Sequence, residues 1–207
     1  MNTDILQPVR LYRALEKGEQ TILFGDPADV HDYCAAALCS KKYNDFPLIM
    51  NEVMESSQFG YELYNMAKFV YNETGMYPKI AVERNTGQAT IFVLKNLNYP
   101  DLFRMVDFTA QSSTEGGGMG WVTTGHWSGG ELQGTRRKML DDFALALKQG
   151  IVKMYDPDQI KQFKSFVRIG GHGQQMPNKK DDLVMATCGA WQVQQLTPTM
   201  YLDDFDA

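Results

Sequence analysis

Three acidic stretches, far apart in the chain, contain side chains that are suited to binding a divalent metal ion. In the first two, an apolar, strand-like segment runs directly into a carboxylate, Asp26 or Glu83. In the third, the pair Asp181 and Asp182 opens an apolar, helix-like segment. Carboxylates brought together from these segments would repel one another unless a cation lay between them, and their oxygen atoms suit Mg²⁺ or Mn²⁺. The pattern therefore predicts metal-dependent phosphoryl chemistry.

Each of these acids also has a structural interpretation. Asp26 precedes Pro27 and could simply start a turn, while Glu83 stands at a helix entrance, where the helix dipole favours a negative charge. Asp181 and Asp182 both suit the cap of a helix. The order of these acids along one α/β pattern favours a shared site over three separate structural roles.

The remaining acidic positions leave alternatives open. Asp182 lies beside the stripe expected to be buried, so it is the better candidate to face the sheet. Asp181 is expected to point to solvent or to support the metal ligands from behind. Asp32, six residues after Asp26, either returns to the site as a further ligand or caps the turn, and the turn is the preferred interpretation.

Basic side chains near these acids are candidate contacts to a phosphate backbone. The candidates are Arg84, Arg136, Arg137, Lys138, Lys179 and Lys180. Lys179 and Lys180 could equally form a solvated turn. His126 and His172 lie in glycine-bounded loops without the spacing of a zinc site, so contact with phosphate and simple exposure both stay open. The chain has neither a phosphate loop of the GxxxxGKS or GxxxxGKT type nor a GxSxG motif.

The composition indicates one globular domain that is large enough to bury a core. The chain has 207 residues, of which 43% are hydrophobic and 22% charged. No apolar run is long enough to cross a bilayer, which predicts no membrane partner. The three cysteines show no CxxC pair and lie in apolar surroundings, which predicts buried, reduced thiols. The net charge of −5 does not exclude nucleic acid, because bound metal would neutralise several acids.

The hydrophobic pattern predicts alternating strands and helices. Strands are expected at 21–26, 33–40, 47–54 and 79–83, with weaker candidates at 102–108, 150–155 and 165–169. Helices are expected at 57–74, 86–96, 135–149, 156–163 and 181–195, and the lead-in at 5–16 has some helical spacing. The glycine-rich segment 111–120 is expected to be a flexible loop, and 170–180 a loop before the last helix. The strand–helix–strand order around 57–74 implies a parallel pair within a mixed sheet.

Four segments carry a resemblance to a known family. They read FGDPADVHDYCAA, VERNTGQATIFVLKNLNYPDLF, GWVTTG followed by TRRKMLDDFALALKQGIV, and KKDDLVMATCGAW. In these the chain resembles the C-terminal nuclease domain of the large terminase subunit of tailed bacteriophages. The resemblance implies an RNase H-like (RuvC-like) α/β fold with a mixed central sheet flanked by helices. This domain would span 20–196, after a lead-in segment 1–20 and before an acidic tail 197–207.

The resemblance also implies a site and an activity. The metal-binding acids would be Asp26, Glu83 and Asp182, with Asp32 as a further acid; Met185 stands where many members have another aspartate. Two Mg²⁺ or Mn²⁺ ions would hydrolyse phosphodiester bonds of double-stranded DNA with little sequence specificity. The expected partners are an N-terminal ATPase domain, the portal and the small terminase subunit. The chain itself is expected to be an excised or separately encoded nuclease fragment without the ATPase domain. The expected location is the host cell cytoplasm.

Two other classes of protein fit the same residues. One is another RNase H-like nuclease, such as a Holliday-junction resolvase or an RNase H. The other is a non-catalytic module that binds DNA or the packaging motor, in which the acids only cap secondary-structure elements. Preference for four-way junctions or RNA–DNA hybrids would indicate the first, and the absence of metal-dependent stabilisation would indicate the second.

Overall fold

A five-stranded mixed sheet forms the centre of the protein. The computed structural model describes residues 8–28, 32–105, 118–124, 126–128, 131–169, 172–175 and 180–199. Its sheet contains β1 (Val9–Leu11), β2 (Thr21–Asp26), β3 (Tyr33–Ser40), β5 (Leu48–Val53) and β6 (Lys79–Val82), in the order β1-β5-β3-β2-β6. The pair β2–β6 is parallel and the other three pairs are antiparallel. The predicted mixed central sheet with a parallel pair is thereby confirmed.

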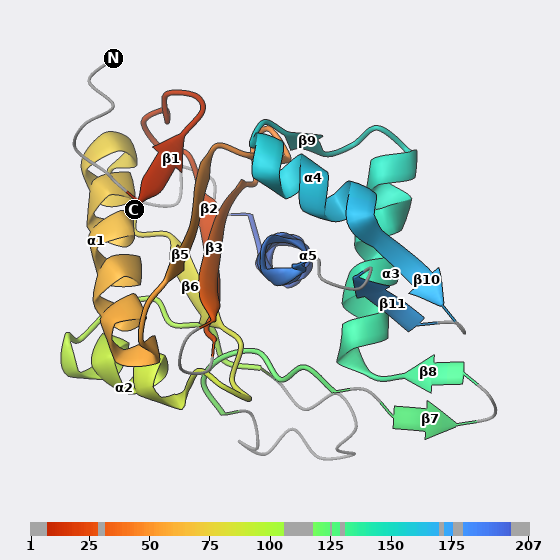
Figure 1. Ribbon diagram of the computed structural model, residues 1–207. Helices are drawn as coiled ribbons and strands as arrows, with labels where there is room; N and C mark the ends of the chain where they lie inside the picture. The colour runs from red at the N-terminus through yellow and green to blue at the C-terminus, as the bar shows by residue number, and fades with distance from the viewer. Residues whose placement is uncertain are drawn as a thin grey trace.

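Helices cover both faces of this sheet, as Figure 1 shows. The helices α1 (Ser56–Thr74) and α2 (Gln88–Asn96) lie on one side, and α5 (Asp182–Leu196) lies on the other. The helices α3 (Thr135–Lys148) and α4 (Pro157–Ser165) pack against α5 as a further layer. Successive residues of β2 and β3 enter opposite cores, since side chains alternate across a strand. Both faces of the central strands are therefore apolar, and the three cysteines are buried and free, as predicted.

A glycine of α5 faces the sheet where the helix packs against β2. A Cβ atom on Gly189 would come within 2.5 Å of the Phe24 ring. The ring fills the space that a side chain on the helix would otherwise occupy, and Phe24 is only 1% exposed. This contact packs the middle of α5 against β2.

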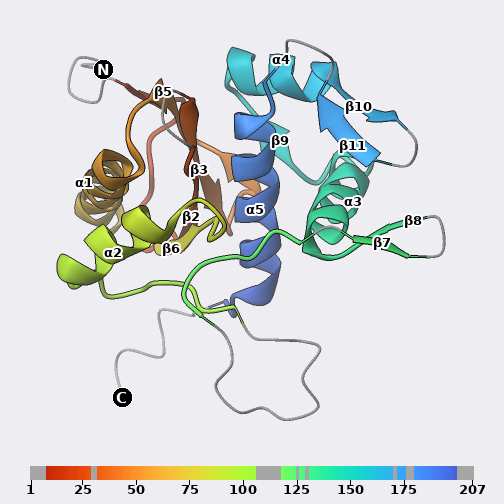
Figure 2. The ribbon, with the colours of Figure 1, turned by 60° about the horizontal axis from the view of Figure 1, so that its bottom comes forward.

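Smaller pairs of strands complete the fold. The strands β4 (Asp45–Phe46) and β9 (Lys153–Met154) are parallel, whereas β10 (Phe166–Ile169) and β11 (His172–Gln175) form an antiparallel pair. A second antiparallel pair, β7 (His126–Ser128) and β8 (Glu131–Gln133), extends outward beyond α3 (Figure 2). No helix among the described residues combines the length and the apolarity needed to span a bilayer.

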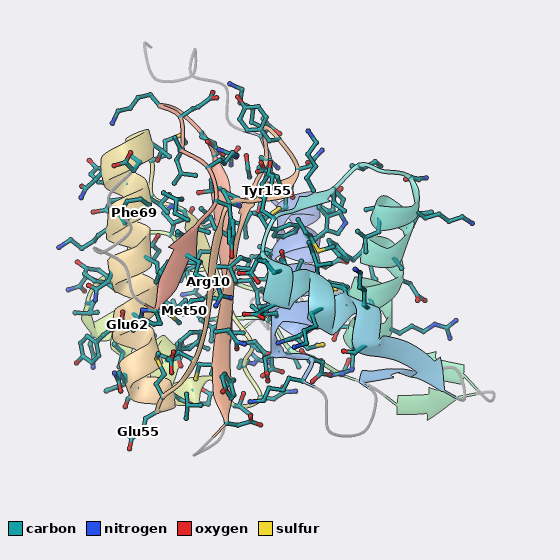
Figure 3. All side chains as sticks on the ribbon, turned by 45° about the horizontal axis from the view of Figure 1, so that its top comes forward. Arg10, Met50, Glu55, Glu62, Phe69 and Tyr155 are labelled. Atoms are coloured by element: carbon teal, nitrogen blue, oxygen red, sulfur yellow. The ribbon has the colours of Figure 1, made fainter. Side chains whose placement is uncertain are left out.

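An ion pair and hydrogen bonds to the buried Asp156 fasten the amino-terminal strand to the rest of the protein. Asp156 caps α4 by accepting a hydrogen bond from the backbone N–H of Gln159, and it also accepts bonds from Arg10 and Tyr12, each of 2.6 Å. Burial, followed by the hydrogen bond to Asp156, raises the pKa of Tyr12 to about 12. In Figure 3, Arg10 marks this cluster on β1, and Tyr155 lies in the segment just before α4.

The structure corrects four local predictions. Residues 9–11 of the lead-in form an edge strand of the sheet rather than helix. Of the strand expected at 102–108, only isolated bridges at Leu102 and Arg104 occur within 102–105, and 106–108 lie outside the described residues. The segment 170–180 contains β11 in place of a continuous loop, and the strand expected at 150–155 shrinks to β9. Tertiary pairing decides these segments, and their own composition is ambiguous.

The longer elements match their predictions closely. The helix expected at 57–74 ends as predicted at Gly75, whose φ of 80° is the left-handed conformation that favours glycine. Its amino-terminal cap residue is Glu55, and no side chain makes a capping hydrogen bond there. Most of the glycine-rich loop, 111–117, lies outside the described residues.

Candidate functional site

Parallel pairing of β2 and β6 brings two of the predicted acids side by side. Gly25 pairs with Val82, and the backbone N–H of Glu83 donates a 2.8 Å hydrogen bond to the Gly25 carbonyl. Because the two strands run in the same direction, their carboxyl ends share one edge of the sheet. Asp26 and Glu83 therefore stand next to each other, although 57 positions separate them in the sequence.

The amino-terminal end of α5 brings further carboxylates to the same edge. Asp181 is the cap residue of this helix and Asp182 is its first residue, which is where the helix dipole favours negative charge. Together with the turn after β2, these elements enclose a pocket of about 580 Å³. Its carboxylates are Asp26, Asp32, Glu83, Asp181 and Asp182. The structure thus brings together all five predicted acidic residues.

These carboxylates raise one another's proton affinity. Burial, followed by the charges of Glu83, Asp182 and Asp181, raises the pKa of Asp26 well above its usual range. Burial, followed by the charges of Asp32 and Asp181, raises the pKa of Asp182 to about 6. Asp182 Oδ2 is buried and has no hydrogen-bond partner among the described residues. A cation in the pocket would relieve both the mutual repulsion and this unpaired oxygen.

The donor set fits a hard divalent cation. Carboxylate oxygens line the pocket, and neither thiol nor imidazole groups belong to its described lining. Within the described parts of the chain, no three acidic, histidine or cysteine side chains already have the arrangement of a metal site. Binding of an ion would therefore require these side chains to move closer together.

Neighbouring polar residues hold the two loops that follow β2 and β6. Thr86 Oγ1 donates a 2.7 Å hydrogen bond to the carbonyl of Pro27, and its backbone N–H donates to Glu83 Oε2 at 3.3 Å. Asn85 Nδ2 donates a 2.7 Å bond to the carbonyl of Thr123. These bonds fasten Glu83, which is only 7% exposed, in the wall of the pocket. The sequence analysis did not predict that Asn85 and Thr86 hold these loops, although the run Asn85, Thr86, Gly87 is typical of a tight turn.

Comparison with known proteins shows which fold surrounds this pocket. The large terminase nuclease from thermophilic phage G20c is 14% identical, with a TM-score of 0.60, over 93% of this chain and 98% of that chain. The same nuclease with bound magnesium is 12% identical, with a TM-score of 0.59, over 88% and 84% of the two chains. The large terminase nuclease domain of Thermus phage P74-26 is 12% identical, with a TM-score of 0.58, over 88% of this chain and 84% of that chain.

This chain has the fold of a phage large terminase nuclease domain. The predicted resemblance is thereby confirmed in the structure. No protein-family model matches the sequence, and no curated protein matches it significantly. At this level of identity the likeness establishes the terminase nuclease fold, whereas the roles of individual residues depend on the geometry of this chain.

In this terminase nuclease fold, the pocket is asymmetric around its acids. Asp32 Oδ1 accepts a 2.8 Å hydrogen bond from the backbone N–H of Tyr33, which matches the preferred role in the turn while leaving the residue in the pocket wall. Asp181 Oδ2 pairs with Arg136 at 3.2 Å. Met185 also lines the pocket, one helical turn after Asp182, where it offers an apolar wall instead of a further oxygen.

The predicted DNA contacts separate into different places. Arg136 lines the acidic pocket, and Lys180 lies over the ring of the pocket residue Tyr33. Arg137 and Lys138 pair with Asp141 and Asp142 one turn further along α3. Arg84 lines a neighbouring pocket, while Lys179 lies outside the described residues. His126 and His172 belong to β7 and β11.

Proposed function

We propose that this protein is a divalent-metal-dependent endodeoxyribonuclease that cuts phage DNA during packaging. One observation carries the proposal: Asp26, Glu83 and Asp182, from three remote segments, line a single pocket in which their charges repel. Partly buried carboxylates that repel one another destabilise a fold, and a bound cation would compensate their charge. Structures of the similar phage nuclease contain magnesium, cobalt or zinc, which supports the same type of site here.

The acidic residues would bind the metal ions in the proposed mechanism. Asp26, Glu83 and Asp182 would hold Mg²⁺ or Mn²⁺, with Asp32 and Asp181 beside them. Bound divalent ions supply an activated water molecule and stabilise the negative charge on the leaving 3′-oxygen. Glu83 is positioned by Thr86, and Asp182 is positioned by the packing of α5 on the sheet. Arg136 pairs with Asp181 and so lowers the negative charge of a wall that an incoming phosphate would approach.

The substrate and context follow from the same proposal. Contacts to the phosphate backbone carry no sequence information, so cutting of double-stranded DNA should show little sequence specificity. We place the nuclease in the host cell cytoplasm, working with an ATPase domain, the portal and the small terminase subunit. The nuclease domain itself would span 20–196, and β1 extends its sheet into the lead-in segment.

A plasmid assay tests the proposal. Supercoiled plasmid would be incubated with the protein and Mg²⁺, Mn²⁺ or EDTA, and nicked and linear products would be separated on a gel. We expect cutting with either ion, none with EDTA, and at least a hundred-fold loss for Asp26→Asn or Asp182→Asn. The matched control is Asp158→Asn on α4, where the side chain is 62% exposed and lies outside the pocket.

Other results would favour the rival classes. Cutting that persists in EDTA, or full activity in both pocket variants, would refute the metal mechanism. Faster cutting of a four-way junction or of an RNA–DNA hybrid than of duplex DNA would indicate another RNase H-like nuclease. The absence of both cutting and metal-dependent thermal stabilisation would indicate a non-catalytic module.

A further inference from the structure

A second pocket, lined by basic residues, lies next to the acidic one. Three cations line it: Arg84 after β6, Lys95 at the end of α2, and Arg104 in the segment after α2. No carboxylate belongs to its described lining, and no ion pair to another described residue is formed by any of these three. The pocket has a volume of about 400 Å³.

The two pockets share one stretch of backbone. Glu83 and Asn85 line the acidic pocket, while Arg84, which lies between them, lines the basic pocket. The chain turns at residues 84–86, directly after β6, so neighbouring residues of one short segment contribute to both pockets. A strand of DNA whose phosphate enters the acidic pocket would therefore carry its neighbouring phosphates past Arg84.

Backbone hydrogen bonds join the segments that carry Arg84 and Arg104 through residues 118–121. The N–H of Arg84 donates a 2.7 Å bond to the carbonyl of Trp121, and the N–H of Gly120 donates a 2.9 Å bond to the carbonyl of Phe103. Arg104 forms isolated bridges with residues 119 and 120. These bonds join the segments 83–84, 102–105 and 118–121 into one surface beside α2, whose position next to β6 is visible in Figure 2.

The floor of the basic pocket positions Arg84 and strengthens its field. A Cβ atom on Gly118 would lie 1.9 Å from Arg84 Nη1, so the guanidinium rests directly on a glycine. Ile91 and Met119 supply apolar walls, and Ile91 is only 7% exposed. Apolar surroundings of low dielectric constant concentrate the field of the three cations on whatever enters.

We propose that this basic pocket, comprising Arg84, Lys95 and Arg104, binds the phosphodiester backbone of DNA beside the site of cutting. The net charge of −5 and the acidic pocket both repel DNA, so binding needs a local concentration of positive charge. This pocket provides one on the backbone shared with the acidic site. The proposal rests on the proposed function only in naming DNA as the ligand.

Salt dependence of binding tests this pocket without any cutting. A fluorescent duplex would be titrated with protein in EDTA, and its anisotropy would be followed from about 50 to about 200 mM salt. Each lost phosphate contact should lower the slope of log affinity against log salt by about 0.9. Raising the salt over this range weakens DNA binding by the wild type and by the variants. For Lys95→Gln and Arg104→Gln, the factor by which binding weakens should each time be about 3.5-fold smaller than for the wild type. The double variant should lower the slope by about twice as much.

A matched variant distinguishes DNA binding in this pocket from an effect of the total charge of the protein. Lys161→Gln removes one exposed cation on α4, outside both pockets, and should leave the slope unchanged. Unchanged slopes for Lys95→Gln and Arg104→Gln, an equal fall for Lys161→Gln, or failure of the wild type to bind duplex would overturn the proposal. Circular dichroism melts confirm that each variant is folded.

The outcomes of this test and of the plasmid assay are independent. Metal-dependent cutting together with unchanged salt slopes would refute the basic pocket and leave the nuclease. Lowered slopes in a protein that cuts no plasmid would refute the nuclease and leave a DNA-binding pocket.

Discussion

In the metal-free protein, the charged carboxylate of Asp182 should destabilise the folded state. Its neighbours and its burial raise the pKa of Asp182 from the ordinary 3.8 to about 6. The unfolded chain therefore loses this proton at lower pH than the folded protein does. Stability falls as pH rises from about 4 to about 6, and it stays reduced at higher pH. Asp182→Asn removes the charge with almost no change in shape, so it should raise the free energy of unfolding above pH 6.

The size of this gain follows from the pKa. Each unit of pKa corresponds to about 1.4 kcal/mol, so the rise of Asp182 to about 6 sets an upper value of about 3 kcal/mol. The side chain is partly open to the pocket, and solvent screening reduces the gain to about 1–2 kcal/mol. Loss of its interaction with the amino-terminal end of α5 opposes the gain by about 0.5 kcal/mol. A net stabilisation of about 1 kcal/mol is expected at neutral pH.

Urea unfolding in EDTA, followed by circular dichroism at several pH values, measures this effect. The difference between Asp182→Asn and wild type should be near zero at about pH 4 and should reach its full value above about pH 6.5. Asp158→Asn, on the exposed face of α4, should stay within about 0.5 kcal/mol of wild type at each pH.

Metal should reverse the ranking of the two proteins. An ion that binds the folded wild type at a hundred times its dissociation constant adds about 2.7 kcal/mol, and Asp182→Asn should gain much less. A variant that is less stable than wild type in EDTA at neutral pH would refute the argument that these carboxylates repel. Equal stabilisation of both proteins by Mg²⁺ would show that Asp182 does not hold the ion.

Three further predictions concern the elements around the pocket. Gly189→Ala should lower stability by about 1–3 kcal/mol in thermal unfolding, because the new methyl group meets the Phe24 ring; an unchanged melting temperature would show that α5 can shift freely. Asp156→Ala should lower the free energy of unfolding in urea by about 3 kcal/mol, because a buried carboxylate that accepts three hydrogen bonds is removed. A decrease below about 1 kcal/mol would contradict this account. Thr86→Val should reduce plasmid cutting about ten-fold with a nearly unchanged melting temperature, because Glu83 and the preceding loop lose their tether; full activity would remove Thr86 from the positioning role.

Local signals in the sequence located most elements correctly. The helix α4 begins at Asp156 and Pro157, a pair that both caps and starts a helix, and α1 ends at Gly75. Periodicity located α3 and α5 within one residue at each end. The misjudged segments are short strands: residues 9–11 pair with the distant β5, and residues 172–175 pair with the preceding strand β10. Such strands depend on pairing and have no pattern of their own.

The positions of the basic side chains could not be predicted from the sequence. Arg136, Arg137 and Lys138 are equivalent as sequence, yet Arg136 lines the acidic pocket, while the other two pair with acids on their own helix. Helix rotation makes this distinction, because neighbours on a helix point about 100° apart. Lys95 and Arg104 carry no motif, and only the fold brings them to Arg84.

The sequence by itself determined that three carboxylates follow or open apolar elements, because each signal lies within a few neighbouring residues. Only the tertiary structure decided that these carboxylates meet. The parallel register of β2 and β6 and the close contact of Gly189 with Phe24 set their places. Charges interact through space, so the raised pKa of Asp26 and the division into an acidic and a basic pocket arise once the chain has folded.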